Sequence, residues 1–106
     1  MKMTFTLEQV PNPLAVLRRA GYSPFTDPGT KKESFTLKPT AGFYPRFHLY
    51  LGNEQGKVIF DLHLDQKKPG YGSNHMHNGE YDSPTVQKEL MRIAGWVNYE
   101  AKNREK

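Results

Sequence analysis

Four histidines and a set of carboxylates are the residues of this chain best suited to chemistry. An imidazole titrates near neutral pH, so one histidine can accept a proton while a second donates one. Two imidazoles suffice for cleavage of RNA by attack of its 2′-hydroxyl, because one takes the hydroxyl proton and the other protonates the leaving oxygen. The residues predicted to form such an acid–base site are His48, Asp61, His63, His75 and His77.

The same side chains are also potential metal ligands. An extended His75-Met76-His77 segment would place both imidazoles on one side, and His63, Asp65, Glu80 or Asp82 would complete the coordination shell. The chain contains no cysteine, so a metal site would consist of imidazole and carboxylate groups only. Because a His-x-His pattern in a polar loop usually binds nothing, we expect a site without a metal or other cofactor, with a His/Asp metal site as an alternative.

Basic and aromatic residues near these histidines favour a nucleic acid as the partner. Phosphate-binding charge and base-stacking surface are supplied by Arg46, Tyr50, Lys67, Lys68 and Tyr71. Lys and Arg exceed Asp and Glu by 15 to 11, and the net charge of +4 favours an anionic ligand. No glycine-rich phosphate loop, Walker pattern or serine nucleophile elbow occurs, which argues against nucleotide hydrolysis and esterase chemistry. RNA is therefore the expected partner, and a protein interaction module is the alternative.

A β-hairpin is predicted to position the first of these side chains. Residues 46–51 and 57–65 each alternate apolar and polar residues with a period of two, around a turn at 52–56. One side of the hairpin is apolar and must be covered by the rest of the protein. The other side carries the polar residues Arg46, His48, Tyr50, Asp61, His63 and Asp65.

The register of this hairpin decides which polar residues meet. Pairing apolar with apolar side chains is satisfied by a short turn centred on Glu54 and Gln55. This register places His48 opposite Asp61 as a His/Asp pair, and Arg46 opposite His63. The alternative interpretation is a solvated sheet face on which charged residues are simply placed opposite their complements.

A first helix of about two turns is predicted near the start of the chain. It begins at Asn12-Pro13, an N-cap followed by proline at the first helical position, and it ends at Gly21. Its apolar stripe consists of Leu14, Leu17 and Ala20.

A longer helix is predicted near the end of the chain. It begins at Ser83-Pro84, which again read as N-cap and first helical residue. Its apolar residues recur every three or four positions and so lie on one face of the helix: Val86, Leu90, Ile93 and Val97. A basic outer stripe, most simply a solvated surface, consists of Lys88, Arg92, Tyr99 and Lys102. The charged tail over 102–106 is expected to fray.

At 106 residues the chain is expected to form a single domain, 1–106, of the α+β class. We predict an antiparallel sheet of three or four strands with two helices packed on one face, because only one face of each strand is apolar. Before the first helix, 1–7 are expected to form an edge strand or a loose terminus. Between that helix and the hairpin we expect a turn or exposed loop over 22–32 and a strand over 33–38.

A long loop over 66–82 is expected between the last strand and the final helix, folded back over the open sheet face. No apolar run is long enough for a signal peptide or a membrane span, so we expect a cytoplasmic protein without membrane contact.

The order helix, three strands, helix resembles the double-stranded RNA binding fold, and in particular the HicA-type toxins. The segment Leu17-Arg18-Arg19-Ala20-Gly21-Tyr22 is similar to that family's helix ending in a Gly-aromatic pair, and 83–96 is similar to its closing helix. The resemblance implies RNA cleavage and makes His48 the candidate for the family's histidine. The segments PRFHLYL, HLDQKKPGYG and HNGEYD also resemble a group of small bacterial proteins, and this resemblance implies no activity.

Overall fold

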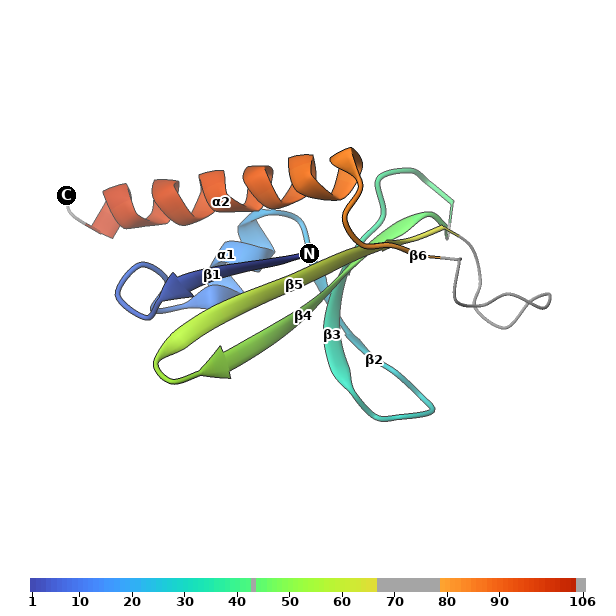
Figure 1. The fold of residues 1–106 in the computed structure, drawn as a ribbon, viewed down its shortest axis with the longest axis horizontal. Coiled ribbons are helices and arrows are strands. Elements are labelled where there is room, and N and C mark those ends of the chain that lie inside the picture. The colour runs from blue at the N-terminus through green and yellow to red at the C-terminus, as the bar shows by residue number, and fades with distance from the viewer. Residues whose placement is uncertain (43, 67–78, 105–106) are drawn as a thin grey trace.

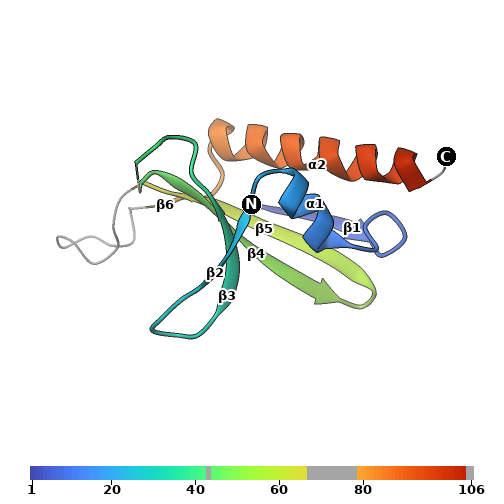
Figure 2. The ribbon, with the colours of Figure 1, turned by 180° about the vertical axis from the view of Figure 1, so that it is seen from behind.

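The computed structural model describes residues 1–42, 44–66 and 79–104, which form a sheet covered on one face by two helices (Figures 1 and 2). The strands are β1 (Lys2–Thr6), β2 (Ser23–Thr26), β3 (Glu33–Leu37), β4 (Arg46–Glu54), β5 (Lys57–Asp65) and β6 (Gly79–Glu80). The helices are α1 (Pro13–Arg19) and α2 (Pro84–Arg104). The predicted α+β class, with both helices on one face of an antiparallel sheet, is confirmed.

The sheet is wider than the three or four strands predicted. Its order is β1-β5-β4-β3-β2, and the two-residue β6 also pairs with β5. β1 is an edge strand, as one of the two alternatives for 1–7 predicted. β2 lies within 22–32, so the prediction of a loop there is wrong for Ser23–Thr26. Pro24 is compatible with β2 because this strand lies at the edge of the sheet, where a missing N–H is tolerated.

The central β4–β5 hairpin closes in two residues, Gln55 and Gly56. Their φ angles are 52° and 75°, the left-handed conformation of a tight hairpin turn whose twist matches that of the strands. The predicted turn centre is therefore wrong by one residue, and every cross-strand pair moves by two. This shift retains the predicted faces but places His48 opposite His63 rather than opposite Asp61.

The hydrophobic core lies between β4–β5 and the two helices. In α1, Asn12 is the N-cap as predicted, with its Oδ1 accepting a hydrogen bond of 3.2 Å from the Ala15 N–H. The buried residues of α1 are Val16 and Leu17, whereas Leu14 is 52% exposed, so its assignment to the apolar stripe is wrong. The sheet and α2 contribute Phe47, Leu49, Val58, Phe60, Leu62, Leu64, Val86, Leu90, Ile93 and Val97.

Helix α2 includes the first residues of the charged tail. The helix continues through Arg104, whose Nη2 donates hydrogen bonds to the carbonyl oxygens of Gln9, at 3.0 Å, and Glu8, at 3.3 Å. The predicted tail over 102–106 therefore begins within α2, its fraying stays a prediction, and 105–106 lie outside the described residues. No helix of the described ranges is both long and apolar enough to cross a membrane.

A buried polar network joins α2 to the end of α1. Glu89 is buried in α2 and accepts a hydrogen bond of 2.7 Å from the Tyr22 hydroxyl. Arg92 donates to both carboxylate oxygens of Glu89, each at 2.8 Å, and to the carbonyl of Ala20 at 2.7 Å. Arg92 was predicted to belong to a solvated basic stripe, and its side chain is 42% exposed, but its guanidinium also links α2 to the end of α1.

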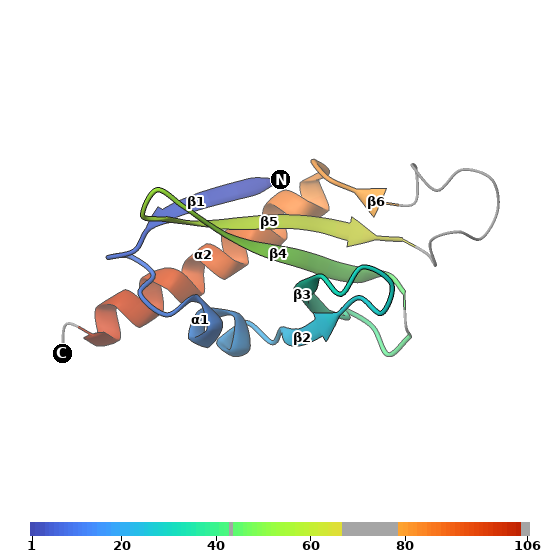
Figure 3. The same cartoon turned by 90° about the horizontal axis from the view of Figure 1, so that it is seen from below.

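The β2–β3 hairpin projects away from the helices, beneath the sheet (Figures 1 and 3). Near its turn, Lys32 places its Nζ 4.4 Å from the ring centroid of Tyr50 on β4. The polar face of β4–β5 is therefore flanked by a second hairpin and is not an open sheet surface. Of the predicted loop over 66–82, residues 67–78 lie outside the described ranges.

Candidate functional site

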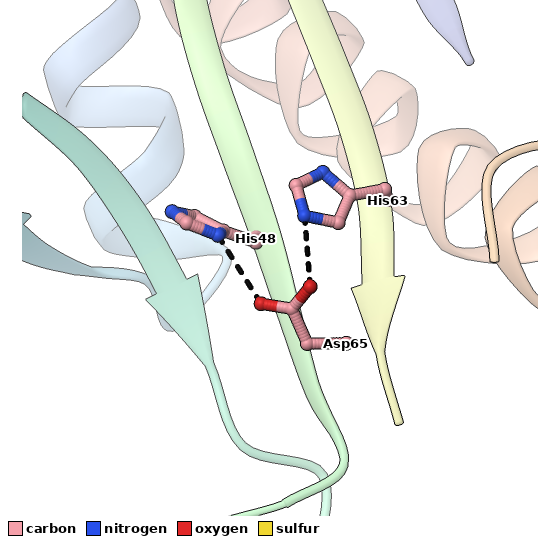
Figure 4. A group of neighbouring side chains, drawn as sticks. All are labelled: His48, His63 and Asp65. Carbon is pink, nitrogen blue, oxygen red and sulfur yellow. Dashed lines mark hydrogen bonds and ion pairs between the residues drawn. The ribbon is translucent and has the colours of Figure 1, made fainter. Parts of the chain in front are cut away.

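Three side chains gather on the polar face of the central hairpin: His48 from β4, and His63 and Asp65 from β5. The β4–β5 register places His48 opposite His63, and Asp65 follows two residues later on the same face. Nδ1 of His48 lies 3.3 Å from Oδ2 of Asp65, and Nε2 of His63 lies 3.0 Å from Oδ1 (Figure 4). One ligand atom from each residue lies within 4.8 Å of the others. We call these three residues the His/Asp cluster.

The His/Asp cluster is largely enclosed. Its side chains are only 9% (His48), 12% (His63) and 15% (Asp65) exposed. Phe25 of β2 contacts the edge of the His48 ring, with 6.0 Å between centroids. Tyr81 stacks on the His63 ring at 5.1 Å and an interplanar angle of 25°. These aromatic rings pack against the two imidazoles of the cluster.

Ser34 of β3 determines which nitrogen of His48 faces the cluster. The Ser34 hydroxyl donates to the carbonyl of Phe25 at 3.3 Å, and its Oγ lies 2.7 Å from Nε2 of His48. The 2.7 Å contact is donated by the ring N–H or by the hydroxyl, according to the tautomer of His48, and in either case it leaves Nδ1 on the side of Asp65. Nδ1 faces the Asp65 carboxylate. Because a nitrogen lone pair and a carboxylate oxygen are both acceptors, a proton or a cation must lie between them.

Asp65 is held in the ionised form. Its burial acts against ionisation, but hydrogen bonds from His48 and His63, together with the charge of the two rings, keep the pKa of this carboxyl well below its usual range. Nε of Arg46 also donates to Oδ2 at 3.4 Å. The cluster therefore offers an ionised carboxylate between two imidazoles throughout the physiological pH range.

The contacts of His48 with Ser34 on one side and Asp65 on the other resemble those of a Ser-His-Asp catalytic triad. Ser34 is only 2% exposed and its hydroxyl is bonded to the backbone of the neighbouring strand. This burial favours a role of Ser34 in orienting His48 over a role as a nucleophile.

The two predicted nucleic-acid contacts in the described part of the chain form walls of the site. The guanidinium of Arg46 lies between the rings of Phe25, at 4.9 Å, and Tyr44, at 5.0 Å. Tyr50 stacks against His63 at 6.0 Å on the side of the cluster facing the β2–β3 turn. Burial, and after it the charge of Asp65, raises the pKa of Tyr50. Both residues contribute to the packing around the cluster.

Of the remaining predicted site residues, the structure describes Asp61, which lies outside the cluster. Asp61 pairs with Tyr50 in the register and its side chain is 42% exposed, so the predicted His48/Asp61 pair is wrong and Asp65 takes its place. The other predicted residues lie outside the described ranges: Lys67, Lys68, Tyr71, His75 and His77. Ser34 was not predicted, although the alternation of 33–38 already places it opposite to the apolar Phe35.

Comparisons with models of protein families, with curated proteins and with solved structures found no match. The resemblance to HicA-type toxins therefore stays a prediction, and the function must be inferred from the site itself.

Proposed function

We propose that the protein binds a divalent transition-metal ion, with Zn²⁺ as the reference case, through His48, His63 and Asp65. The observation that supports this most directly is the convergence of one ligand atom from each residue within 4.8 Å. Two imidazoles and one carboxylate form a recurrent ligand set of catalytic zinc and of other open transition-metal sites. The orientation of His48 supports the proposal further, because metal-binding histidines usually donate their second N–H to a fixed acceptor.

Metal binding accounts for the geometry better than acid–base chemistry by the histidines alone. A general acid or base must reach the proton it transfers, within hydrogen-bond distance of the substrate. Both ring nitrogens of His48 already have partners, and the ring is 9% exposed. A single ion between His48, His63 and Asp65 replaces the shared proton and satisfies all three groups.

The site would be of the open kind. Three protein ligands leave at least one coordination position of Zn²⁺ for water or a substrate, where the ion acts as a Lewis acid. RNA binding and RNA cleavage by the histidines alone stay predictions. RNA cleavage that persists in EDTA would distinguish histidine-only chemistry from chemistry that needs the metal.

Thermal unfolding with added metal tests the proposal. An ion bound only by the native state raises the free energy of unfolding, by about 2.7 kcal/mol at an ion concentration 100 times its Kd. The melting temperature rises with it. We expect stabilisation by Zn²⁺ and less by Mn²⁺, reversed by EDTA, and none by Mg²⁺, which prefers oxygen ligands. Melting temperatures that are identical in Zn²⁺, Mg²⁺ and EDTA would contradict it.

A further inference from the structure

A cavity of about 370 Å³ lies beside the His/Asp cluster. The sheet register shows where it is: Ser23 of β2 pairs with Thr36 of β3, and Thr36 pairs with His48 of β4. Paired residues share a face, so these three side chains form a row across the strands. Ser23 and Thr36 line the cavity from the face that carries the cluster, and Leu37 lines it from the other face, so the cavity lies at the end of β3 beside the start of β4. Its volume is in the range of roughly 300–1,000 Å³ that is typical of small-ligand sites.

The cavity offers positive charge and hydroxyl groups. Arg46 and Lys38 supply two cations, Ser23 and Thr36 supply two hydroxyls, and Phe25 forms an apolar wall. None of the described residues that line it is acidic. A lining with two cations and two hydroxyls matches the oxygens of a phosphate group better than a neutral ligand.

Arg46 belongs to both the cavity and the neighbourhood of the cluster. Its Nε donates to Asp65 at 3.4 Å, while the planar guanidinium is held between Phe25 and Tyr44. This packing presents the guanidinium in one orientation, so little side-chain entropy is lost when it contacts an anion.

We propose that this cavity binds the phosphate group of a small phosphate monoester and holds the molecule next to the metal centre. The assignment of a substrate rests on the proposed metal function. The phosphate pocket itself does not, because none of the three proposed ligands lines it.

Titration with inorganic phosphate, followed by backbone amide NMR of the whole chain in EDTA, tests the pocket. We expect saturable shifts at Ser23, Thr36 and Lys38 that sodium acetate at equal ionic strength does not reproduce. Replacing the exposed Lys38 (Lys38→Gln) should lower phosphate affinity about fivefold, since one charged contact is lost. Lys57→Gln, the same change near the turn of the β4–β5 hairpin, should leave it unchanged. An absence of saturable shifts, or equal loss in both variants, would overturn the pocket.

Zn²⁺ and phosphate titrations on two variants separate this proposal from the metal function. Lys38→Gln should keep its Zn²⁺ affinity, and His63→Asn should lose Zn²⁺ but keep phosphate in EDTA. Phosphate binding without Zn²⁺ binding in the wild type would overturn the metal centre and support the pocket. Zn²⁺ binding without phosphate binding would overturn the pocket and support the metal centre.

Discussion

Oγ of Ser34 lies 2.7 Å from Nε2 of His48, on the opposite side of the imidazole from Asp65. This contact fixes the ring so that Nδ1 is the nitrogen presented to the cluster. Ser34 is buried in β3, and its contact with Nε2 supports a role in orienting His48, a proposed ligand.

Replacing Ser34 with alanine is expected to lower Zn²⁺ affinity by about tenfold or more, since His48 loses the hydrogen-bond partner that orients it. Isothermal titration of folded Ser34→Ala measures this effect. Thr26→Ala, an exposed hydroxyl deletion on the adjacent strand β2, should retain wild-type affinity. Equal affinities of Ser34→Ala and the wild type would show that the serine does not orient a ligand.

The stability of the metal-free protein should depend on Asp65 in acid. The folded-state pKa of this carboxyl is depressed, so Asp65 stabilises the protein above its unfolded pKa of about 3.9, and this contribution is lost as pH falls toward the folded-state pKa. Denaturant unfolding between about pH 5 and pH 2 should show the loss. In Asp65→Asn the decline should be shallower, and a decline as steep as that of the wild type would be inconsistent with this assignment.

The contact of Glu89 with Tyr22 and Arg92 is expected to hold α2 against the end of α1. Burial and the neighbouring Glu89 raise the pKa of Tyr22 far above its usual value, so the phenol remains a protonated donor. Glu89→Ala leaves that buried donor without its acceptor and leaves the guanidinium of Arg92 with only the Ala20 carbonyl among its described acceptors, so it should lower the free energy of unfolding by about 2–3 kcal/mol.

Urea unfolding of Glu89→Ala and Glu100→Gln compares this buried network with a more exposed ion pair. Glu100 pairs with Arg19 at 3.1 Å, and Arg19 is 54% exposed, so its loss should cost less than about 1 kcal/mol. Neither change should alter Zn²⁺ affinity, because both residues lie on α2, across the sheet from the cluster. A Glu89→Ala variant as stable as Glu100→Gln would rule out the structural role.

The turn of the central hairpin offers a stabilising substitution. Gln55 adopts a φ of 52°, a conformation that asparagine tolerates better than glutamine. Gln55→Asn should therefore raise the free energy of unfolding by roughly 0.5 kcal/mol and preserve the register that pairs His48 with His63. Gly56→Ala should be destabilising, since φ is 75° there. A destabilised Gln55→Asn would argue against the turn geometry.

Local patterns predicted both helices, the central hairpin and the strand over 33–38 but not β2 or β6, while the contacts between elements decided the site. Alternation in 46–51 and 57–65 identified the hairpin and both of its faces, and Asn12-Pro13 marked a helix start. The pairing of His48 was wrong because register depends on the turn backbone, and apolar matching accepts two registers that differ by two residues. The Ser34 contact depends on how the β2–β3 hairpin lies against β4, which periodicity does not report.

The role of Glu89 escaped prediction for a similar reason. A single glutamate within an apolar stripe looks like a boundary residue until α1 is placed beside it, with Tyr22 supplying the donor. The predicted sites over 67–78 lie outside the described ranges, so the contribution of His75 and His77 stays a prediction.

Isothermal titration of Zn²⁺ into the folded protein and a set of folded variants tests the central claim most directly. The account predicts one Zn²⁺ per chain in the wild type, and loss of this binding in each of His48→Asn, His63→Asn and Asp65→Asn. The double variant His75→Ala with His77→Ala, which removes the other two imidazoles, is the matched control and should still bind one ion. Binding that survives all three single changes, or that disappears only in the double variant, would contradict the account.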